Sequence, residues 1–445
     1  MRRFRKHALV GLFGMLFLGA GLSLGFRIQK ADDRSLFLPG QTTAGHYQIE
    51  LRCDACHAPF GGVTNDACNK CHGAELAAVD DAHPLSKFTD PRNAGRLESI
   101  DALHCATCHR EHQPEITRPM GLTQPVDYCF HCHEDIAEDR PSHAGLAFTT
   151  CATAGCHNYH DNSALYEAFI LKHLDEPDVK PAAVRPARLA RRSSSAPPFT
   201  VAQRDEPRVV HAEPLLVDQW EHSGHAAADV NCSACHQPPG GDPAWLGQPG
   251  HNTCAQCHDF EVEGFLAGRH GMRLAAGLSA MSPTAARLPM DPQSGHRTLS
   301  CSSCHDAHSV DTRTAAVDSC LKCHADDHAK AYVGSEHHRL WRRELNGLAP
   351  PGSGVSCATC HLPREVHREN GEQVVRVQHN QNLNLRPAEK MLRSVCLDCH
   401  GYAFALDALA DPNLVQVNFR GTPAHHLETI EMVRRRQSGE KQKNP

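Results

Sequence analysis

The cysteines of this chain fall into eleven close pairs, and a histidine directly follows the second cysteine of every pair. The 445 residues contain 22 Cys and 34 His, so no cysteine remains outside the pairs. Numbered 1 to 11 along the chain, motifs 1–4 and 6–11 have two residues between the cysteines and are Cys53/Cys56-His57, Cys68/Cys71-His72, Cys105/Cys108-His109, Cys129/Cys132-His133, Cys232/Cys235-His236, Cys254/Cys257-His258, Cys301/Cys304-His305, Cys320/Cys323-His324, Cys357/Cys360-His361 and Cys396/Cys399-His400. Motif 5, Cys151/Cys156-His157, has four. A chain that repeats two thiols and an imidazole in this way must fold around whatever they bind.

The spacing Cys-x-x-Cys-His is the attachment site of c-type haem. The two thiols bond to the porphyrin, and the adjoining imidazole becomes the proximal ligand of the iron. Zinc ribbons and disulfides are the alternatives, since a four-cysteine zinc site accepts the spacing of motifs 1 and 2. With His at 34 of 445 positions, ten chance histidines would have a probability of about 10⁻¹¹. The sequence therefore predicts about eleven covalently attached haem c groups. For motif 5, a disulfide loop or a decayed haem site that no longer binds haem remains the alternative.

The second axial ligand decides whether a haem transfers electrons or performs chemistry. Subtracting the eleven motif histidines from 34 leaves 23, against eight methionines in all, which predicts bis-histidine ligation. His112 in HCATCHREH and His308 in SCSSCHDAH each lie three residues past a motif histidine. His225 and His296 precede their motifs by seven and five residues. These four are the predicted second ligands, and an ordinary surface histidine is the alternative for each.

Composition and charge divide the chain further. A charge-free run of 19 residues, 8–26, follows the basic MRRFRKH. It is long for a signal-peptide core and about long enough to span a bilayer, with the basic residues inside. The predicted divisions are an N-terminal membrane anchor or signal peptide (1–30), a pentahaem domain (41–174), a Pro/Ala/Arg-rich linker (175–214), a hexahaem domain (215–430) and a polar C-terminal tail (431–445).

The predicted fold is mainly α with extensive loops, little sheet, a haem-filled core and an N-terminal membrane helix. Aromatic residues make up only 5%, while 29 Pro and 32 Gly interrupt long elements. Helical periodicity is present at 162–174, at 337–345 and at the start of the C-terminal segment from 425. The net charge of −6 gives no field that would hold nucleic acid.

The doubled motifs with trailing histidines resemble the class III and tetrahaem families of multihaem cytochromes c, over residues of about 46–160 and 222–330. The anchor followed by haem motifs resembles membrane-bound quinol dehydrogenases. The second half, with GRHGM around His270, SCSSCHDAHS and VSCATCHLP, is loosely similar to the octahaem hydroxylamine oxidoreductase group. The Cys-x-x-Cys-Lys mark of the pentahaem nitrite reductases is absent from the sequence, which argues against that enzyme.

These resemblances imply an electron carrier, rather than an enzyme with catalytic residues, on the periplasmic side of the bacterial inner membrane. The donor would be quinol or a membrane quinol oxidoreductase, and the acceptor a periplasmic reductase or another cytochrome. A soluble periplasmic protein after signal cleavage is the alternative location. The alternative function is a multihaem oxidoreductase acting on a small nitrogen or sulfur compound at one five-coordinate haem. Asp326, Asp327, His328 and Tyr332 would then supply acid and base groups.

Overall fold

A computed structural model of the whole chain divides into two compact units. The first comprises residues 1–73, 100–124 and 276–278, and the second 74–99, 125–275 and 279–445. The structure describes all residues except 1, 30–37, 80–82, 84, 141–142, 146, 152–158, 161–166, 182–184, 186–198, 209, 211–212, 239–243, 370, 386–389, 425 and 439–445. Cys156 and His157 of motif 5 and about half of the predicted linker therefore lie outside the described residues.

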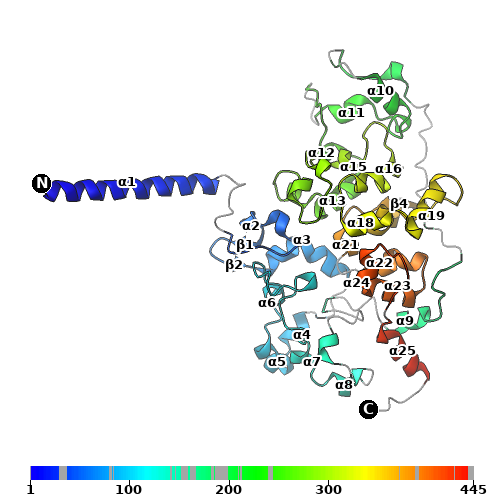
Figure 1. Ribbon diagram of the computed structural model, residues 1–445, viewed down its shortest axis with the longest axis horizontal. Coiled ribbons are helices and arrows are strands. Elements are labelled where there is room, and N and C mark those ends of the chain that lie inside the picture. Colours follow the sequence, from blue (N-terminus) through cyan, green and yellow to red (C-terminus); the bar gives the residue numbers. More distant parts are fainter. Residues whose placement is uncertain are drawn as a thin grey trace. The chain divides into compact units, whose positions relative to one another are not determined.

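The first unit carries motifs 1 to 3 on short helices (Figure 1). Its elements are α1 (Arg2–Gln29), α2 (Cys53–Cys56), β1 (His57–Ala58), β2 (Gly62–Val63), the start of α3 (Asn65–Ala78) and α6 (Cys105–Cys108). The two strands pair antiparallel, with His57 opposite Val63. α1 covers the apolar run near the N-terminus, which contains no proline. Among the described residues no helix combines the length and apolarity needed to cross a bilayer, so the predicted membrane helix has no support in the structure.

The second unit carries the remaining motifs, and its elements are also mostly short. They are α4 (Leu85–Thr89), α5 (Ala94–Ser99), α7 (Phe130–His133), α8 (Ile136–Asp139), α9 (Glu167–His173), α10 (Pro214–Glu221), α11 (Cys232–His236), α12 (His251–Cys254), α13 (Asp259–Ala267), α14 (Met272–Ala275), α15 (Cys301–Cys304), α16 (Thr312–Ala316), α17 (Asp318–Leu321), α18 (Asp327–Tyr332), α19 (Glu336–Leu345), α20 (Cys357–His361), β3 (Arg364–Glu369), β4 (Glu372–Val377), α21 (Asn382–Leu385), α22 (Lys390–Ser394), α23 (Tyr402–Ala410), α24 (Pro412–Gln416) and α25 (Glu428–Ser438).

The largest apolar cluster of the second unit lies where α9, α22, α23 and α25 meet. α23 is the centre because its sequence, YAFALDALA, is apolar almost all round, as a buried helix requires. Tyr402 and Leu406 are at most 1% exposed there, and Ile170 of α9 and Ile430 of α25 pack against them. A smaller cluster joins Val317, Tyr332 and Trp341.

The prediction of a mainly helical fold with little sheet and long loops is confirmed. In the described part of the chain, the sheets are two hairpins, β1–β2 and β3–β4. In the second, Arg364 pairs with Val377 and Glu369 with Glu372. Of the predicted helices, 337–345 is present as α19, and the C-terminal segment is helical as α25. For 162–174 the structure gives α9, and residues 162–166 lie outside the described residues.

Candidate haem sites

Several Cys-x-x-Cys segments fold as a single helical turn. α2, α6 and α15 begin and end at the two motif cysteines. Because residues three apart share one face of a helix, the two thiols lie side by side. Polar side chains just before some motifs accept the free N–H groups at the start of the turn. Ser356 accepts from the Thr359 N–H, and Asn231 from that of Cys232.

The thiols themselves show no competing use. None of the cysteines in the described part forms a disulfide. Within the same residues there is no group of three or more Cys, His, Asp and Glu side chains that could hold a metal ion. Burial raises the pKa of Cys304 and of Cys360 to about 11. Such surroundings suit uncharged sulfur, which is the state of a thioether to porphyrin.

Among the second cysteines of the motifs, Cys71 and Cys257 are exposed, whereas Cys304, Cys323 and Cys360 are half-buried.

The second cysteines Cys71, Cys257 and Cys323 each lie near the second cysteine of the preceding motif. Electrostatic interactions join Cys71 to Cys56, Cys257 to Cys235 and Cys323 to Cys304. The attachment of haem to Cys71, Cys257 and Cys323 stays a prediction that rests on the motif.

Eight of the motif histidines face one further histidine each, with ring centroids 5.9 to 6.2 Å apart. With the motif histidine first, the pairs are His72/His46, His133/His83, His236/His308, His258/His225, His305/His379, His324/His270, His361/His328 and His400/His337. Both members of each pair lie in the same compact unit.

The separation of the rings is that of two ligands on one metal ion. A metal–imidazole bond is about 2.0–2.1 Å long and the nitrogen lies about 1.1 Å from its ring centre, so opposed imidazoles have centroids about 6.2–6.4 Å apart. Rings in direct stacking are much closer, as in His83 and Tyr159 at 4.1 Å. The eight pairs therefore fit a haem iron between two axial histidines.

Hydrogen bonds turn the paired imidazoles toward this gap. The Nδ1–H groups of five of them donate to backbone carbonyls at 2.5 to 2.9 Å. They are His83 to Tyr159, His236 to Leu246, His328 to Val415, His379 to Val377 and His400 to Asp178. A proton fixed on Nδ1 leaves the lone pair of Nε2 for a metal.

Burial also keeps several of these rings neutral. Burial, together with a smaller effect of neighbouring histidines, lowers the pKa of His270, His337 and His361 to about 4. Because only neutral imidazole binds a metal, these three rings are ready to do so at physiological pH.

The four predicted second ligands have different positions. His225 and His308 face His258 and His236. His112 is half-buried, and its Nδ1 donates to the Gly40 carbonyl at 2.8 Å. His296 is exposed on the loop before α15 and is not a member of the eight pairs. The remaining partners, His46, His83, His270, His328, His337 and His379, were not distinguished by sequence reasoning.

A repeated register could have identified one of them. His46 lies seven residues before Cys53, and its ring faces the histidine of the next motif, His72. His225 lies seven residues before Cys232 and likewise faces the histidine of the next motif. His308 lies seven residues after the first cysteine of motif 8, and His112 seven residues after that of motif 3.

Three motif histidines fall outside the eight pairs. His57 is exposed in β1. His109 donates from Nδ1 to the Gly121 carbonyl at 3.3 Å. His157 lies outside the described residues.

Consecutive motifs are neighbours within each unit. Thiol pairs close enough to hydrogen-bond join the first cysteines of motifs 2 and 3, 4 and 5, 7 and 8, and 9 and 10: Cys68/Cys105, Cys129/Cys151, Cys254/Cys301 and Cys320/Cys357. Electrostatic interactions link the second cysteine of one motif to the first of the next in motifs 6/7, 8/9 and 10/11: Cys235/Cys254, Cys304/Cys320 and Cys360/Cys396. Motifs 6 to 11 thus form an unbroken series in the second unit.

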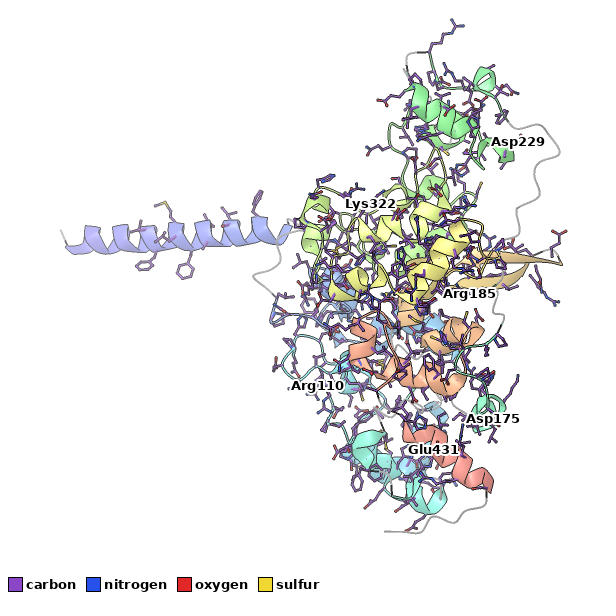
Figure 2. The ribbon with its side chains drawn as sticks, turned by 45° about the vertical axis from the view of Figure 1, so that its right-hand side comes forward. Arg110, Asp175, Arg185, Asp229, Lys322 and Glu431 are labelled. Carbon is purple, nitrogen blue, oxygen red and sulfur yellow. The ribbon has the colours of Figure 1, made fainter. Side chains whose placement is uncertain are left out.

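The beginning of the predicted linker is part of the motif 11 site. The Asp178 carbonyl accepts from His400 Nδ1 at 2.9 Å, and the Lys180 backbone N–H donates to the Cys399 carbonyl at 2.8 Å. A side chain at Gly401 would collide with the carbonyls of residues 176 and 177, so glycine permits this approach. Arg185, labelled in Figure 2, donates to the backbone of Gly352 and Gly354.

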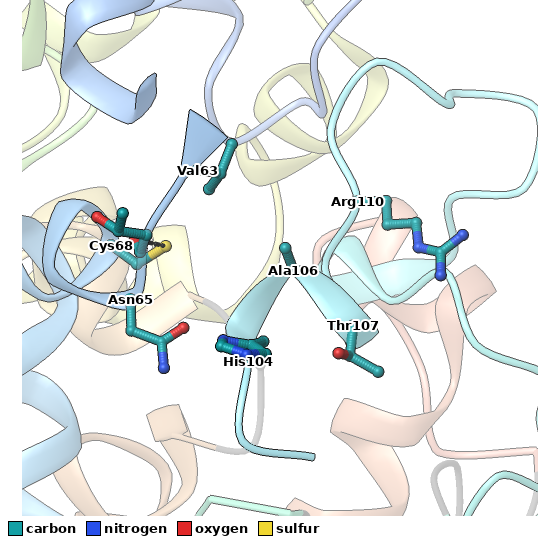
Figure 3. A pocket seen from close by; sticks show the side chains of 8 residues that line it. Val63, Asn65, Cys68, His104, Ala106, Thr107 and Arg110 are labelled. Carbon is teal, nitrogen blue, oxygen red and sulfur yellow. Dashed lines mark hydrogen bonds between the residues drawn. The ribbon is translucent and has the colours of Figure 1, made fainter. Parts of the chain in front are cut away.

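A cavity of about 330 Å³ in the first unit lies between motifs 2 and 3. Figure 3 shows Cys68 on one side of it and Ala106 and Thr107 of α6 on the other. Because motif residues from both sites line it, this space belongs to the haem sites.

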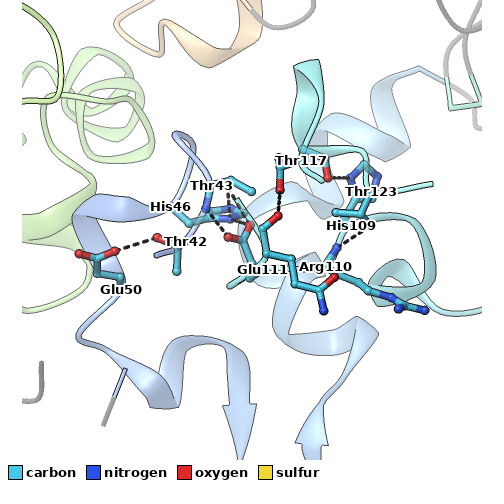
Figure 4. A network of polar contacts seen from close by, with 11 residues as sticks. Thr42, Thr43, His46, Glu50, His109, Arg110, Glu111, Thr117 and Thr123 are labelled. Carbon is cyan, nitrogen blue, oxygen red and sulfur yellow. Dashed lines mark hydrogen bonds and ion pairs between the residues drawn. The ribbon is translucent and has the colours of Figure 1, made fainter. Parts of the chain in front are cut away.

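One axial histidine has a carboxylate beside it. His46 Nδ1 lies 2.6 Å from Glu111 Oε1, and Glu111 also accepts from the N–H and the hydroxyl of Thr43 (Figure 4). Burial by itself would raise the pKa of Glu111, but the hydrogen bonds from His46 and Thr43 outweigh it and lower that pKa to about 2.

Two family models match the chain. That of cytochrome c3 matches residues 45–134, which hold motifs 1 to 4. That of the doubled CXXCH motif matches residues 225–263, which begin at His225 and hold motifs 6 and 7. Comparison with curated proteins and with solved structures finds no match. The likeness of the second half to the octahaem hydroxylamine oxidoreductase group is not shown by these matches and stays a prediction.

Proposed function

We propose, from the premise that the chain is a multihaem cytochrome c with covalently bound haem c, that it carries electrons one at a time along a series of bis-histidine haems. Haem supplies the one-electron iron couple, and the protein sets its potential through the axial ligands, their hydrogen bonds and burial. The observation that carries the proposal is the set of eight histidine pairs at the separation that an iron between them requires.

The series of neighbouring motifs supports a path. Motifs 6 to 11 follow one another through their cysteines. Haems attached to neighbouring thiols lie close together, so an electron can cross the second unit in short steps in the order of the sequence.

Three of the four residues that the enzyme alternative needed, Asp326, His328 and Tyr332, make contacts within the fold. Asp326 accepts from the Ala329 N–H at the start of α18, and His328 faces His361. The Tyr332 hydroxyl donates to the Val355 carbonyl at 2.8 Å and is buried. These contacts favour an electron carrier over an oxidoreductase with an open haem.

The repeated register extends the ligand assignment to motif 1. His308 faces the histidine of motif 6, which begins the second series. His112 holds the same place in the first series, so we assign it to the iron bound by His57. With this assignment, and with haem at motifs 3 and 5 as well, the chain carries about eleven haems.

The cytochrome c3 match supports a periplasmic location. Within it we propose a donor at the membrane, quinol or a membrane quinol oxidoreductase, and a periplasmic reductase or another cytochrome as acceptor. The N-terminal segment is either an anchor or a cleaved signal. Cell fractionation with N-terminal sequencing of the mature protein separates the two.

The direct test uses the purified holoprotein. Its mass minus that of the chain counts the covalent haems, and electron paramagnetic resonance (EPR) reports the spin state of each ferric iron. We expect about eleven haems, all low-spin. A protein without a haem spectrum would refute the proposal, and a stoichiometric high-spin haem would support the enzyme alternative. Cys151→Ser combined with Cys156→Ser should lower the count by one if motif 5 carries haem.

A further inference from the structure

His46 and His225 occupy equivalent places in the two halves but differ in what holds them. Each lies seven residues before the first cysteine of its series and faces the histidine of the following motif. The Nδ1–H of His46 donates to the carboxylate of Glu111 at 2.6 Å. His225 instead bonds to the backbone of Ala307.

The two acceptors are themselves equivalent. Glu111 lies two residues after His109 of motif 3, and Ala307 lies two residues after His305 of motif 8. The halves therefore use the same position to orient the same axial ligand. The hydrogen-bond acceptor at that position is a carboxylate in the first half and a neutral backbone carbonyl in the second half.

The carboxylate is built into its place. Glu111 is 24% exposed, and its Oε2 accepts from the Thr43 N–H at 2.5 Å while Oε1 accepts from the Thr43 hydroxyl at 2.8 Å (Figure 4). A glutamate carries its negative charge at neutral pH. The charge is thus fixed against the outer nitrogen of an axial imidazole.

A fixed negative charge at this position acts on the iron through the ring. A carboxylate that accepts the outer N–H raises the basicity of the ligating imidazole. Ferric haem carries one positive charge more than ferrous haem, so the contact stabilises the oxidised form. A backbone carbonyl carries no net charge and has a smaller effect.

We propose that Glu111 is a positioning residue that lowers the reduction potential of the haem at motif 2 below that of its counterpart at motif 7. The first unit then holds a haem that is harder to reduce than its repeat partner, although both have two histidine ligands. The inference rests on the proposed ligation of that haem by His46 and His72.

The test compares wild type with Glu111→Gln, which keeps an oxygen acceptor and removes the charge, and with Glu111→Ala. The control is Glu50→Gln, which removes a carboxylate of the same unit that accepts from the Thr42 hydroxyl at 3.1 Å. Potentiometric titration followed by visible and EPR spectra measures every one-electron wave of the holoprotein.

In both Glu111 variants we expect the reduction potential of one haem to rise by at least about 59 mV. For one electron this shift is a tenfold change in the ferric-to-ferrous ratio. The Glu50 variant should shift less. Low-spin spectra with no moved wave in Glu111→Gln would overturn the inference and leave bis-histidine ligation standing. A high-spin haem already present in wild type would instead count against the proposed function. If Glu111→Ala fails to retain its haems, the near-isosteric Glu111→Gln decides.

Discussion

His379→Ala should open one iron of the second unit. The His379 ring faces His305 of motif 8 with centroids 6.2 Å apart, although 74 residues separate them in the sequence. Its Nδ1 donates to the Val377 carbonyl at 2.8 Å, which directs Nε2 toward His305. Alanine removes the imidazole and leaves the iron at motif 8 with one axial histidine.

The fold around the substitution should persist, because the backbone there is held by other side chains. Gln381 donates to the His379 carbonyl at 2.9 Å, and Gln378 accepts from the Asn380 N–H at 2.9 Å. Neither bond uses the imidazole ring. The substitution should therefore remove one axial ligand of the iron and leave the backbone of the surrounding loop in place.

The expected magnitude is one haem in eleven, or about 9% of the iron, converted from low-spin to high-spin. Quantitative EPR of the oxidised holoprotein measures this fraction. Free imidazole added to the solution should restore the low-spin signal, because the gap between the centroids admits one such ring on the open side of the iron.

His367→Ala is the matched control. His367 lies on β3 of the neighbouring hairpin, with Nε2 3.2 Å from Glu365 and its ring against Phe260. His367 is not a member of the eight histidine pairs, so its loss should leave every haem low-spin. The ligand assignment would be refuted if the His379 variant stayed wholly low-spin or if the His367 variant gave the same high-spin signal.

Three further predictions concern stability. Leu406→Ala should destabilise the second unit by about 2–5 kcal/mol, since Leu406 is 1% exposed; Leu348→Ala, at a 67% exposed side chain, should cost no more than about 0.5 kcal/mol in the same denaturant titration. Asp411→Ala should cost about 1–3 kcal/mol, because this buried carboxylate accepts three backbone N–H groups; an unchanged denaturation midpoint would contradict this role. A hydrogen bond to Asp407 raises the pKa of His426 above 6.5, so its stabilisation is fully present below pH 6.5 and is lost as pH rises through the raised value. After correction for the intrinsic pH dependence of exchange, the protection of the α25 amides should fall over that range in wild type, and His426→Ala should abolish that fall.

The covalent chemistry could be predicted from the sequence because it is local. Thiols three residues apart and the adjoining imidazole need only one turn of helix, and that turn is present at α2, α6 and α15. The periodicity of 337–345 likewise predicted α19, whose Trp341 packs inward.

The second ligands could not be predicted in the same way, since chain folding brings them from far away. His337 reaches His400 and His270 reaches His324 across 63 and 54 residues. In a chain with 34 histidines, nearness to a motif does not distinguish a ligand. Equivalent sequence positions in the two halves are what identify a second axial ligand, as they do for His46 and His225.

The contact between residues 176–180 and motif 11 limits how the protein can be divided. A shortened chain that begins at residue 215, where composition alone would cut, lacks the Asp178 carbonyl that accepts from His400. Its last haem would have water as the acceptor of the proximal N–H, and its potential would not represent that of the whole protein. Separate expression of the second half should therefore retain residues 167–181, so that α9 and the strand-like segment after it accompany the haems they support.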